Sequence, residues 1–118
     1  MPTPSKNDLL AGFGPEVREA FERFCATGDE ASLRIIVEAA VRSFMPARGA
    51  AARDLPLRDD ARLVEDLGFD SLAVAETAFF FEDLFQITIT NPELLSLRTV
   101  GELRAFAVLK YAERKPAA

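Results

Sequence analysis

The fold is constrained most strongly by the spacing of apolar residues between positions 29 and 45. Apolar side chains recur there at intervals of three and four residues, which is the period of one face of an α-helix. The members of this stripe are Leu33, Ile36, Val37, Ala40, Val41 and Phe44. Pro46 disfavours continuation of the helix past Met45. A helix with one long apolar face needs other elements to cover it, so the remaining chain must supply packing partners.

Three other segments predict helices that can serve as these partners. Residues 15–27 begin with proline, which suits a first helical turn, and Gly28 follows as a stop signal. Residues 70–85 begin with Asp70, whose carboxylate can accept hydrogen bonds from the free amides of the first turn. The stretch Thr99-Val100-Gly101-Glu102 has the pattern of a capping box and opens the last helix.

The segments between these helices add little regular structure. Residues 46–62 mix proline, glycine and charge without a period, which predicts a long loop. Residues 87–90 (ITIT) alternate like a strand but are too few to build a sheet. Asn91 followed by proline predicts a cap and one short turn or helix through about Leu95. We therefore predict an all-α fold, a small helical bundle with an added N-terminal helix.

The stretch GFDSL, residues 68–72, places one hydroxyl, that of Ser71, at the predicted start of a helix. The first turn of a helix has unpaired amide hydrogens and the positive end of the helix dipole, which favour a phosphate ester. Serine is also a preferred helix cap. The position alone leaves both roles open for Ser71.

Enzymatic roles are disfavoured by the residues that the chain lacks. A serine nucleophile needs a base, and the sequence contains no histidine, while Lys6, Lys110 and Lys115 lie near the ends. The glycine pattern G-x-S-x-G is not present around Ser71. With Cys25 as the one cysteine, a metal site could draw only on carboxylates, and we predict none.

The negative charge is concentrated in the middle of the chain. The net charge is −5, and residues 60–95 contain eight acidic residues against Arg62 alone. Phosphate repels such a segment, which argues against nucleic acid as a partner. The acidic segment favours approach by a basic protein surface, although a merely solvated helix face would have the same composition.

The compartment is indicated by three features of the sequence. No apolar run is long enough to cross a bilayer, and the N-terminus MPTPSKNDLL does not have the pattern of a signal peptide. Cys25 has no second cysteine with which to form an internal disulfide. We expect a cytoplasmic, monomeric protein.

Residues 63–72, LVEDLGFDSL, resemble the attachment motif L-x-x-D-L-G-x-D-S-L of acyl carrier proteins. The resemblance extends from about residue 30 to residue 112 and includes the T-V-x-E-L opening of the last helix at Thr99. It implies a four-helix bundle of three main helices and a short one. In that family the serine that matches Ser71 carries 4′-phosphopantetheine. The arm is transferred from coenzyme A by a separate phosphopantetheinyl transferase, so the chain itself needs no base and is not an enzyme.

The resemblance also implies roles for the neighbours of Ser71. Asp70 is expected to help the transferase and its metal engage the site. Leu72 is expected to be partly buried and to fix the helix start, and Gly68 suits a tight backbone just before it.

The same resemblance predicts a docking surface beside the serine. At about 100° per residue, the arc adjoining Ser71 and the arc facing the core separate along the helix. The docking candidates are Glu76, Phe79, Glu82 and Asp83. Phe79 is either an exposed anchor for a partner or a side chain folded inward. Ala73 stands where the family commonly has an acidic residue, a departure from the usual docking pattern.

Residues that could line a pocket for the acyl chain are also predicted core residues. They are Ala78, Phe81, Phe85, Ile89, Val100, Leu103 and Phe106. Their aromatic rings leave little room, which favours a small cargo or one held at the surface.

The chain divides into an N-terminal extension (1–28), a carrier domain (29–112) and a basic tail (113–118), for which we predict disorder. Phe80 and Leu84 are expected to form an apolar strip that receives three side chains of the extension. These side chains are Val17, Phe21 and Phe24. The extension could instead be a loose segment that docks on partners. In either form it marks a specialised type of carrier.

The function that follows is an acyl carrier protein that presents thioesters to enzymes of fatty-acid, lipid or polyketide-type synthesis. Its expected partners are the transferase and acyl-loading and acyl-using enzymes with basic docking surfaces. Two alternatives stay open: a peptidyl or aminoacyl carrier of a nonribosomal pathway, and a protein-binding module with unmodified Ser71.

Overall fold

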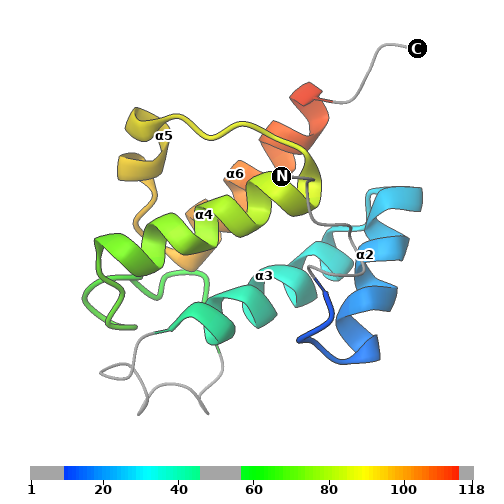
Figure 1. Cartoon of the computed structure of the whole chain (residues 1–118), viewed down its shortest axis with the longest axis horizontal. Helices are drawn as coiled ribbons and strands as arrows, with labels where there is room; N and C mark the ends of the chain where they lie inside the picture. Colours follow the sequence, from blue (N-terminus) through cyan, green and yellow to red (C-terminus); the bar gives the residue numbers. More distant parts are fainter. Residues whose placement is uncertain (1–9, 46–56, 115–118) are drawn as a thin grey trace.

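A computed structural model describes residues 10–45 and 57–114, and the structural statements below concern these residues. The elements in chain order are α2 (Pro15–Thr27), α3 (Glu30–Phe44), α4 (Ser71–Phe85), α5 (Asn91–Ser96) and α6 (Val100–Arg114). Figure 1 shows α3 and α4 crossing the molecule, with α2 at one end of the bundle and α5 near the other. Within the described ranges the only strand-like pairing is an isolated bridge between Arg62 and Thr99. The prediction of an all-α fold is confirmed.

The central element is α3, which packs against α2, α4 and α6. Its start is held by Asp29, whose carboxylate accepts hydrogen bonds from the Ser32 amide at 3.1 Å and the Ser32 hydroxyl at 2.7 Å. The predicted stripe is buried from Leu33 to Val41, and Phe44 is half-buried. This helix matches its predicted bounds closely, since Asp29 caps its start and it ends at Phe44, with Met45 as the C-cap.

The N-terminal helix α2 is packed against the bundle. Gly28 ends it in a left-handed conformation, with a φ of 74°, and its N–H donates to the Phe24 carbonyl at 2.7 Å. The inward side chains are almost fully buried: Val17, Ala20, Phe21 and Phe24. This burial supports the predicted docked helix and contradicts the loose segment.

The apolar strip of α4 that was expected to contact α2 is wrong in part. The rings of Phe21 and Phe24 lie 5.9 and 5.7 Å from the ring of Phe85. Phe80 instead contacts Phe13, in the turn before α2, and Phe44 of α3, both at 5.7 Å. The reason is that α2 lies beside the C-terminal end of α4 (Figure 1), and Phe85 is the last residue of that helix.

The segment between residue 57 and α4 is irregular, as predicted for the end of the long loop. Two backbone hydrogen bonds hold it to the start of α6. The Leu63 amide donates to the carbonyl of Arg98, just before α6, at 2.8 Å, and the Val100 amide donates to the Ala61 carbonyl at 3.0 Å. Asp59 adds an ion pair with Arg104. These contacts fix the chain just before the serine.

The predicted cap of the short helix is wrong by one residue. Thr90 caps α5, since its hydroxyl accepts from the Glu93 amide at 3.4 Å and the Glu93 carboxylate accepts from the Thr90 amide at 2.9 Å. Asn91 is the first helical residue. The reciprocal pair of Thr90 and Glu93 satisfies two free amides, whereas an Asn91 cap would satisfy one.

The capping box predicted for the last helix is confirmed. The Glu102 carboxylate accepts from the Thr99 amide at 3.0 Å, and the Thr99 hydroxyl accepts from the Glu102 amide at 3.1 Å. Val100, Leu103 and Ala107 are buried on this helix, while Phe106 is half-buried with the Lys110 ammonium 5.7 Å from its ring centre.

Parts of the predicted organisation lie outside the described residues. These parts are residues 1–9 of the extension, residues 46–56 of the loop and residues 115–118 of the tail. The backbone of residues 113 and 114 continues α6, so the predicted disordered tail begins too early. None of the helices in the described part of the chain is long and apolar enough to span a membrane.

Candidate functional site

Ser71 is the first residue of α4, and its side chain is exposed. Asp70 precedes it in extended backbone, with φ −109° and ψ −178°, and its carboxylate accepts from the Ala73 amide at 2.8 Å. Within the described residues, the Ser71 hydroxyl has no hydrogen-bond partner. The capping role therefore belongs to Asp70, and the hydroxyl of Ser71 is available at the start of the helix.

The chain before Ser71 is a tight turn with a buried side. Gly68 has a φ of 75°, a left-handed conformation that favours glycine, as the sequence predicts. The Phe69 amide donates to the Leu63 carbonyl at 2.8 Å, and both side chains are buried. This turn fixes the direction in which the chain enters α4, so Ser71 follows a well-packed turn.

Asp66 closes the same turn on its outer side. Its carboxylate accepts from the backbone amide of Arg62 at 2.8 Å and lies 3.5 Å from the guanidinium of that residue. The backbone amide and then the guanidinium hold the pKa of the Asp66 carboxyl below its usual value. Asp66 is therefore a structural acid of the turn.

The role predicted for Leu72 is wrong. Its side chain is 67% exposed, so it does not fix the helix start by burial. Ala73 is the buried residue of the first turn, and Phe69 supplies the apolar anchor on the other side of the serine. Leu72 faces outward because it lies on the same side of α4 as the exposed Glu76 and Phe79, four and seven residues further along.

The docking candidates differ in their exposure. Phe79 is 61% exposed and Glu76 is exposed, so the inward alternative for Phe79 is wrong. Glu82 and Asp83 are half-buried. The Glu82 carboxylate accepts from the Ile89 amide at 2.8 Å and so holds the chain that leaves α4. The exposed face beside the serine consists of Leu72, Glu76 and Phe79, which we call the serine-side face.

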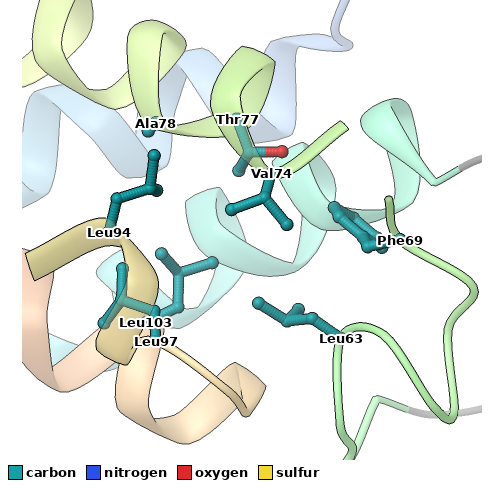
Figure 2. A pocket seen from close by; sticks show the side chains of 8 residues that line it. All are labelled: Leu63, Phe69, Val74, Thr77, Ala78, Leu94, Leu97 and Leu103. Atoms are coloured by element: carbon teal, nitrogen blue, oxygen red, sulfur yellow. The ribbon is translucent and has the colours of Figure 1, made fainter. Parts of the chain in front are cut away.

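A small cavity lies between α4, α5, α6 and the turn before the serine (Figure 2). Its volume is about 10 Å³, room for a single water molecule. Its lining is Leu63, Phe69, Val74, Thr77, Ala78, Leu94, Leu97 and Leu103. The one polar side chain, Thr77, donates its hydroxyl to the Ala73 carbonyl at 2.8 Å, so the cavity presents apolar walls.

Two of the predicted pocket residues, Ala78 and Leu103, line this cavity. Phe81, Phe85 and Val100 are buried core residues that do not line it. Ile89 and Phe106 are half-buried and also lie outside the lining.

The sequence reasoning did not find the contribution of the turn or of α5. The apolar positions of the attachment motif, Leu63 and Phe69, were the available signal for the turn. Leu94 and Leu97 had no such signal, because a short helix without a buried residue has no apolar period to read.

Metal chemistry finds no support in the described ranges, where no group of three or more carboxylate or cysteine side chains is placed to hold an ion. What the geometry does offer is an exposed hydroxyl at a helix N-terminus. The free amides and the dipole of α4 favour a phosphate ester there.

Comparison with known proteins decides the family. The family described as phosphopantetheine attachment site matches residues 48–107, just over half of the chain. The acyl carrier protein MbtL of Mycolicibacterium paratuberculosis is 50% identical over 46 residues, which are 39% of this chain and 52% of that protein. The chain belongs to the acyl carrier protein family.

The carrier is similar to further proteins of mycobacteria. MbtL of Mycobacterium tuberculosis H37Rv is 43% identical over 54 residues, 46% of the carrier and 64% of that protein. The meromycolate extension acyl carrier protein of Mycolicibacterium aurum is 40% identical over 55 residues, 47% of the carrier and 56% of that protein. The carrier thus spans about half to two thirds of the length of these relatives. No solved structure matches it.

Family membership confirms the resemblance seen in the attachment motif and supplies the cofactor. Members bear a covalently attached 4′-phosphopantetheine, and they are carriers on which enzymes act rather than enzymes themselves. The exposed Ser71 hydroxyl at the start of α4 fits such a group, because nothing in the described residues covers or occupies it.

Proposed function

We propose that Ser71 is the attachment residue and that the carrier holds acyl groups as thioesters at the end of the arm. The observation that carries this proposal is that two neighbouring residues have separate roles at the start of α4. Asp70 caps the helix, and the Ser71 hydroxyl beside it is exposed and unbonded within the described residues.

The residues around Ser71 suit the transfer of the arm. The serine oxygen forms the new bond to a phosphorus of coenzyme A, the bond from that phosphorus to the adenosine bisphosphate breaks, and the serine proton leaves. We assign that proton to a base of the transferase, because the sequence contains no histidine and Lys110, the one lysine of the described residues, pairs with Glu93 and Glu113. The amides of the first turn and the helix dipole then favour the phosphodiester. The arm supplies the thiol that carries the acyl group.

Partner enzymes are expected to bind the serine-side face. Phe79 offers a large exposed ring, and Glu76 stands beside it on the same face of α4. The net charge of −7 over residues 60–95 favours a basic surface on the partner. A basic transferase or acyl-handling enzyme with an apolar pocket for Phe79 is the partner that this surface fits.

The names of the relatives support a role in lipid or polyketide-type synthesis. One of them is a meromycolate extension acyl carrier protein, and others are acyl carrier proteins named MbtL. Acyl groups captured on the carrier in cells would identify the pathway, since an aminoacyl cargo would indicate a nonribosomal pathway instead.

Intact-mass measurement tests the attachment. The carrier is incubated with coenzyme A and a promiscuous phosphopantetheinyl transferase, and we expect the mass of one phosphopantetheine to be added. Ser71→Ala is expected to add none, whereas Ser96→Ala serves as a matched control, because Ser96 is an exposed serine at the end of α5. No addition to the wild type would favour a binding module with unmodified Ser71.

A further inference from the structure

The cavity near the attachment site is lined by residues whose helix faces continue into aromatic residues. On α4 its lining runs from Val74 to Ala78, and the next residue of the same helix stripe is Phe81, which is 1% exposed. On α6 the lining residue Leu103 is followed along the same face by Ala107 and then Tyr111. Both helix faces therefore lead from the cavity toward aromatic rings.

Those rings form a continuous cluster across three helices. Phe81 lies 5.8 Å from Phe85, and Phe85 lies 6.1 Å from Tyr111, measured between ring centres. The N-terminal helix α2 completes the cluster, because Phe24 lies 5.7 Å from Phe85 and 4.9 Å from Tyr111. We call Phe24, Phe81, Phe85 and Tyr111 the aromatic wall.

The aromatic wall closes the bundle at the end remote from the attachment site. In Figure 1, α2 lies at the end of α4 opposite to its start. Phe21 also packs on Phe85 from α2, at 5.9 Å. A ring that is buried and backed by other rings resists displacement, since interiors are packed about as densely as organic crystals. Phe81 is thus held in place by α2 through Phe85.

The opposite side of the cavity is held less tightly. Leu94 and Leu97 line the cavity from α5 and the residue that ends it, and α5 contains no buried residue. Its link to α6 includes an ion pair between Glu93 and Lys110 at 2.9 Å. Because Leu94 and Leu97 are only partly buried, an entering acyl chain can displace them more readily than it can displace Phe81.

We propose that the bundle accepts short acyl chains only, and that α2 sets this limit by holding the aromatic wall against the cavity. This inference rests on the proposed attachment at Ser71. The lining from Val74 to Ala78 covers a rise of about 6 Å at about 1.5 Å per residue. A zigzag chain of about five carbon–carbon bonds of about 1.5 Å each spans that rise. Longer chains meet Phe81 and stay outside.

Melting temperatures of carriers loaded with different acyl groups test the limit. Acetyl, butyryl, hexanoyl, octanoyl, lauroyl and palmitoyl forms are made from the acyl-coenzyme A thioesters, and intact mass confirms one group per chain before melting. We expect the melting temperature to rise to a maximum at butyryl or hexanoyl, because burial of the chain stabilises the folded state. Longer groups are expected to give no further rise.

Variants of the wall separate the limit from general stability. Phe81→Leu and Phe24→Leu are expected to move the maximum to octanoyl or longer, since each gives the wall room to yield. Asp29→Ala is the control, because Asp29 caps α3 through the Ser32 amide and hydroxyl and contributes no ring to the aromatic wall. It is expected to lower every melting temperature and leave the maximum at the same chain length.

The outcomes distinguish this inference from the proposed function. A carrier that takes no group at Ser71 would overturn both. A loaded carrier would overturn the inference alone if palmitoyl stabilised it most, if no acyl group stabilised it, or if Phe24→Leu left the maximum unchanged.

Discussion

Asp70 and Ala73 are joined by a hydrogen bond of 2.8 Å, from the Ala73 amide to the Asp70 carboxylate, across the exposed Ser71. The acid that neighbours the serine therefore has a structural task of its own. Any effect of changing Asp70 on transfer of the arm combines this cap with whatever the acid does for the transferase.

Asp70→Ala is expected to lower the free energy of unfolding by about 0.5–2 kcal/mol, the usual effect of losing a helix cap. Asp70→Asn keeps a capping oxygen and removes the charge, so its stability should stay close to that of the wild type. Chemical denaturation measures both. If the acid also helps the transferase, Asp70→Asn will be loaded more slowly despite its stability; loading at the wild-type rate would leave Asp70 as a cap only.

Phe79→Ala is expected to change stability by no more than about 0.5 kcal/mol, because the ring is 61% exposed. Binding to a partner enzyme should weaken at least several-fold, as expected for an aromatic anchor. Titration calorimetry with the transferase measures the affinity.

Phe80→Ala, at the neighbouring aromatic residue of α4, is the control for the effect on stability. Phe80 is 8% exposed and packs on Phe13, Phe44 and Phe81, so Phe80→Ala should cost about 3–5 kcal/mol of stability. An unchanged affinity in Phe79→Ala would remove the ring from the docking surface.

The helices could be predicted from the sequence wherever a period and a cap coincide. Asp29, Asp70 and the Thr99 box each mark a start that the structure reproduces within one residue. The helical period places Leu72 on the arc of Glu76 and Phe79, so its outward direction could be predicted from the sequence; the expectation of burial came from the family resemblance.

The partners of α2 were harder to predict. An apolar stripe tells which face of a helix is buried but not where along a neighbouring helix it lands. Phe80 and Phe85 are both buried aromatic residues of α4, and the choice between them depends on the path of the turn around Phe13. That path is a tertiary property.

The pairing of Asp59 with Arg104 is expected to make stability depend on pH. The Arg104 guanidinium, which donates to both carboxylate oxygens, holds the pKa of Asp59 below its usual value of 3.8. A lowered pKa in the folded state stabilises the fold above about pH 4, and this contribution is lost as the pH falls through the folded-state pKa. Because Asp59 is half exposed, we expect about 1 kcal/mol or less.

Melting of Asp59→Asn against the wild type from neutral to acidic pH measures this contribution. The difference in melting temperature should be constant near neutral pH and shrink below about pH 4. Asp60→Asn is the control, since its ion pair with Arg58 is largely exposed and should contribute little. A difference for Asp59→Asn that persists undiminished in acid would contradict the assignment.

Gly101→Ala is expected to destabilise the carrier although alanine favours helices. A Cβ at Gly101 would lie 3.0 Å from both the Cβ and the carbonyl oxygen of Asp59, and the Gly101 amide donates to that carbonyl at 2.8 Å. The crowding should cost about 1–3 kcal/mol, which outweighs the gain in propensity. Gly12→Ala has open space around the new methyl group and serves as the control. A Gly101→Ala protein as stable as the wild type would show that the loop can move away from α6.

The central claim is that Ser71 bears the arm, and peptide mapping tests it most directly. After loading with coenzyme A and the transferase, trypsin releases residues 63–98, a peptide that contains both Ser71 and Ser96. Fragmentation in the mass spectrometer is expected to place one phosphopantetheine on Ser71 and none on Ser96. An unmodified peptide, or an arm on any other residue, would contradict the account.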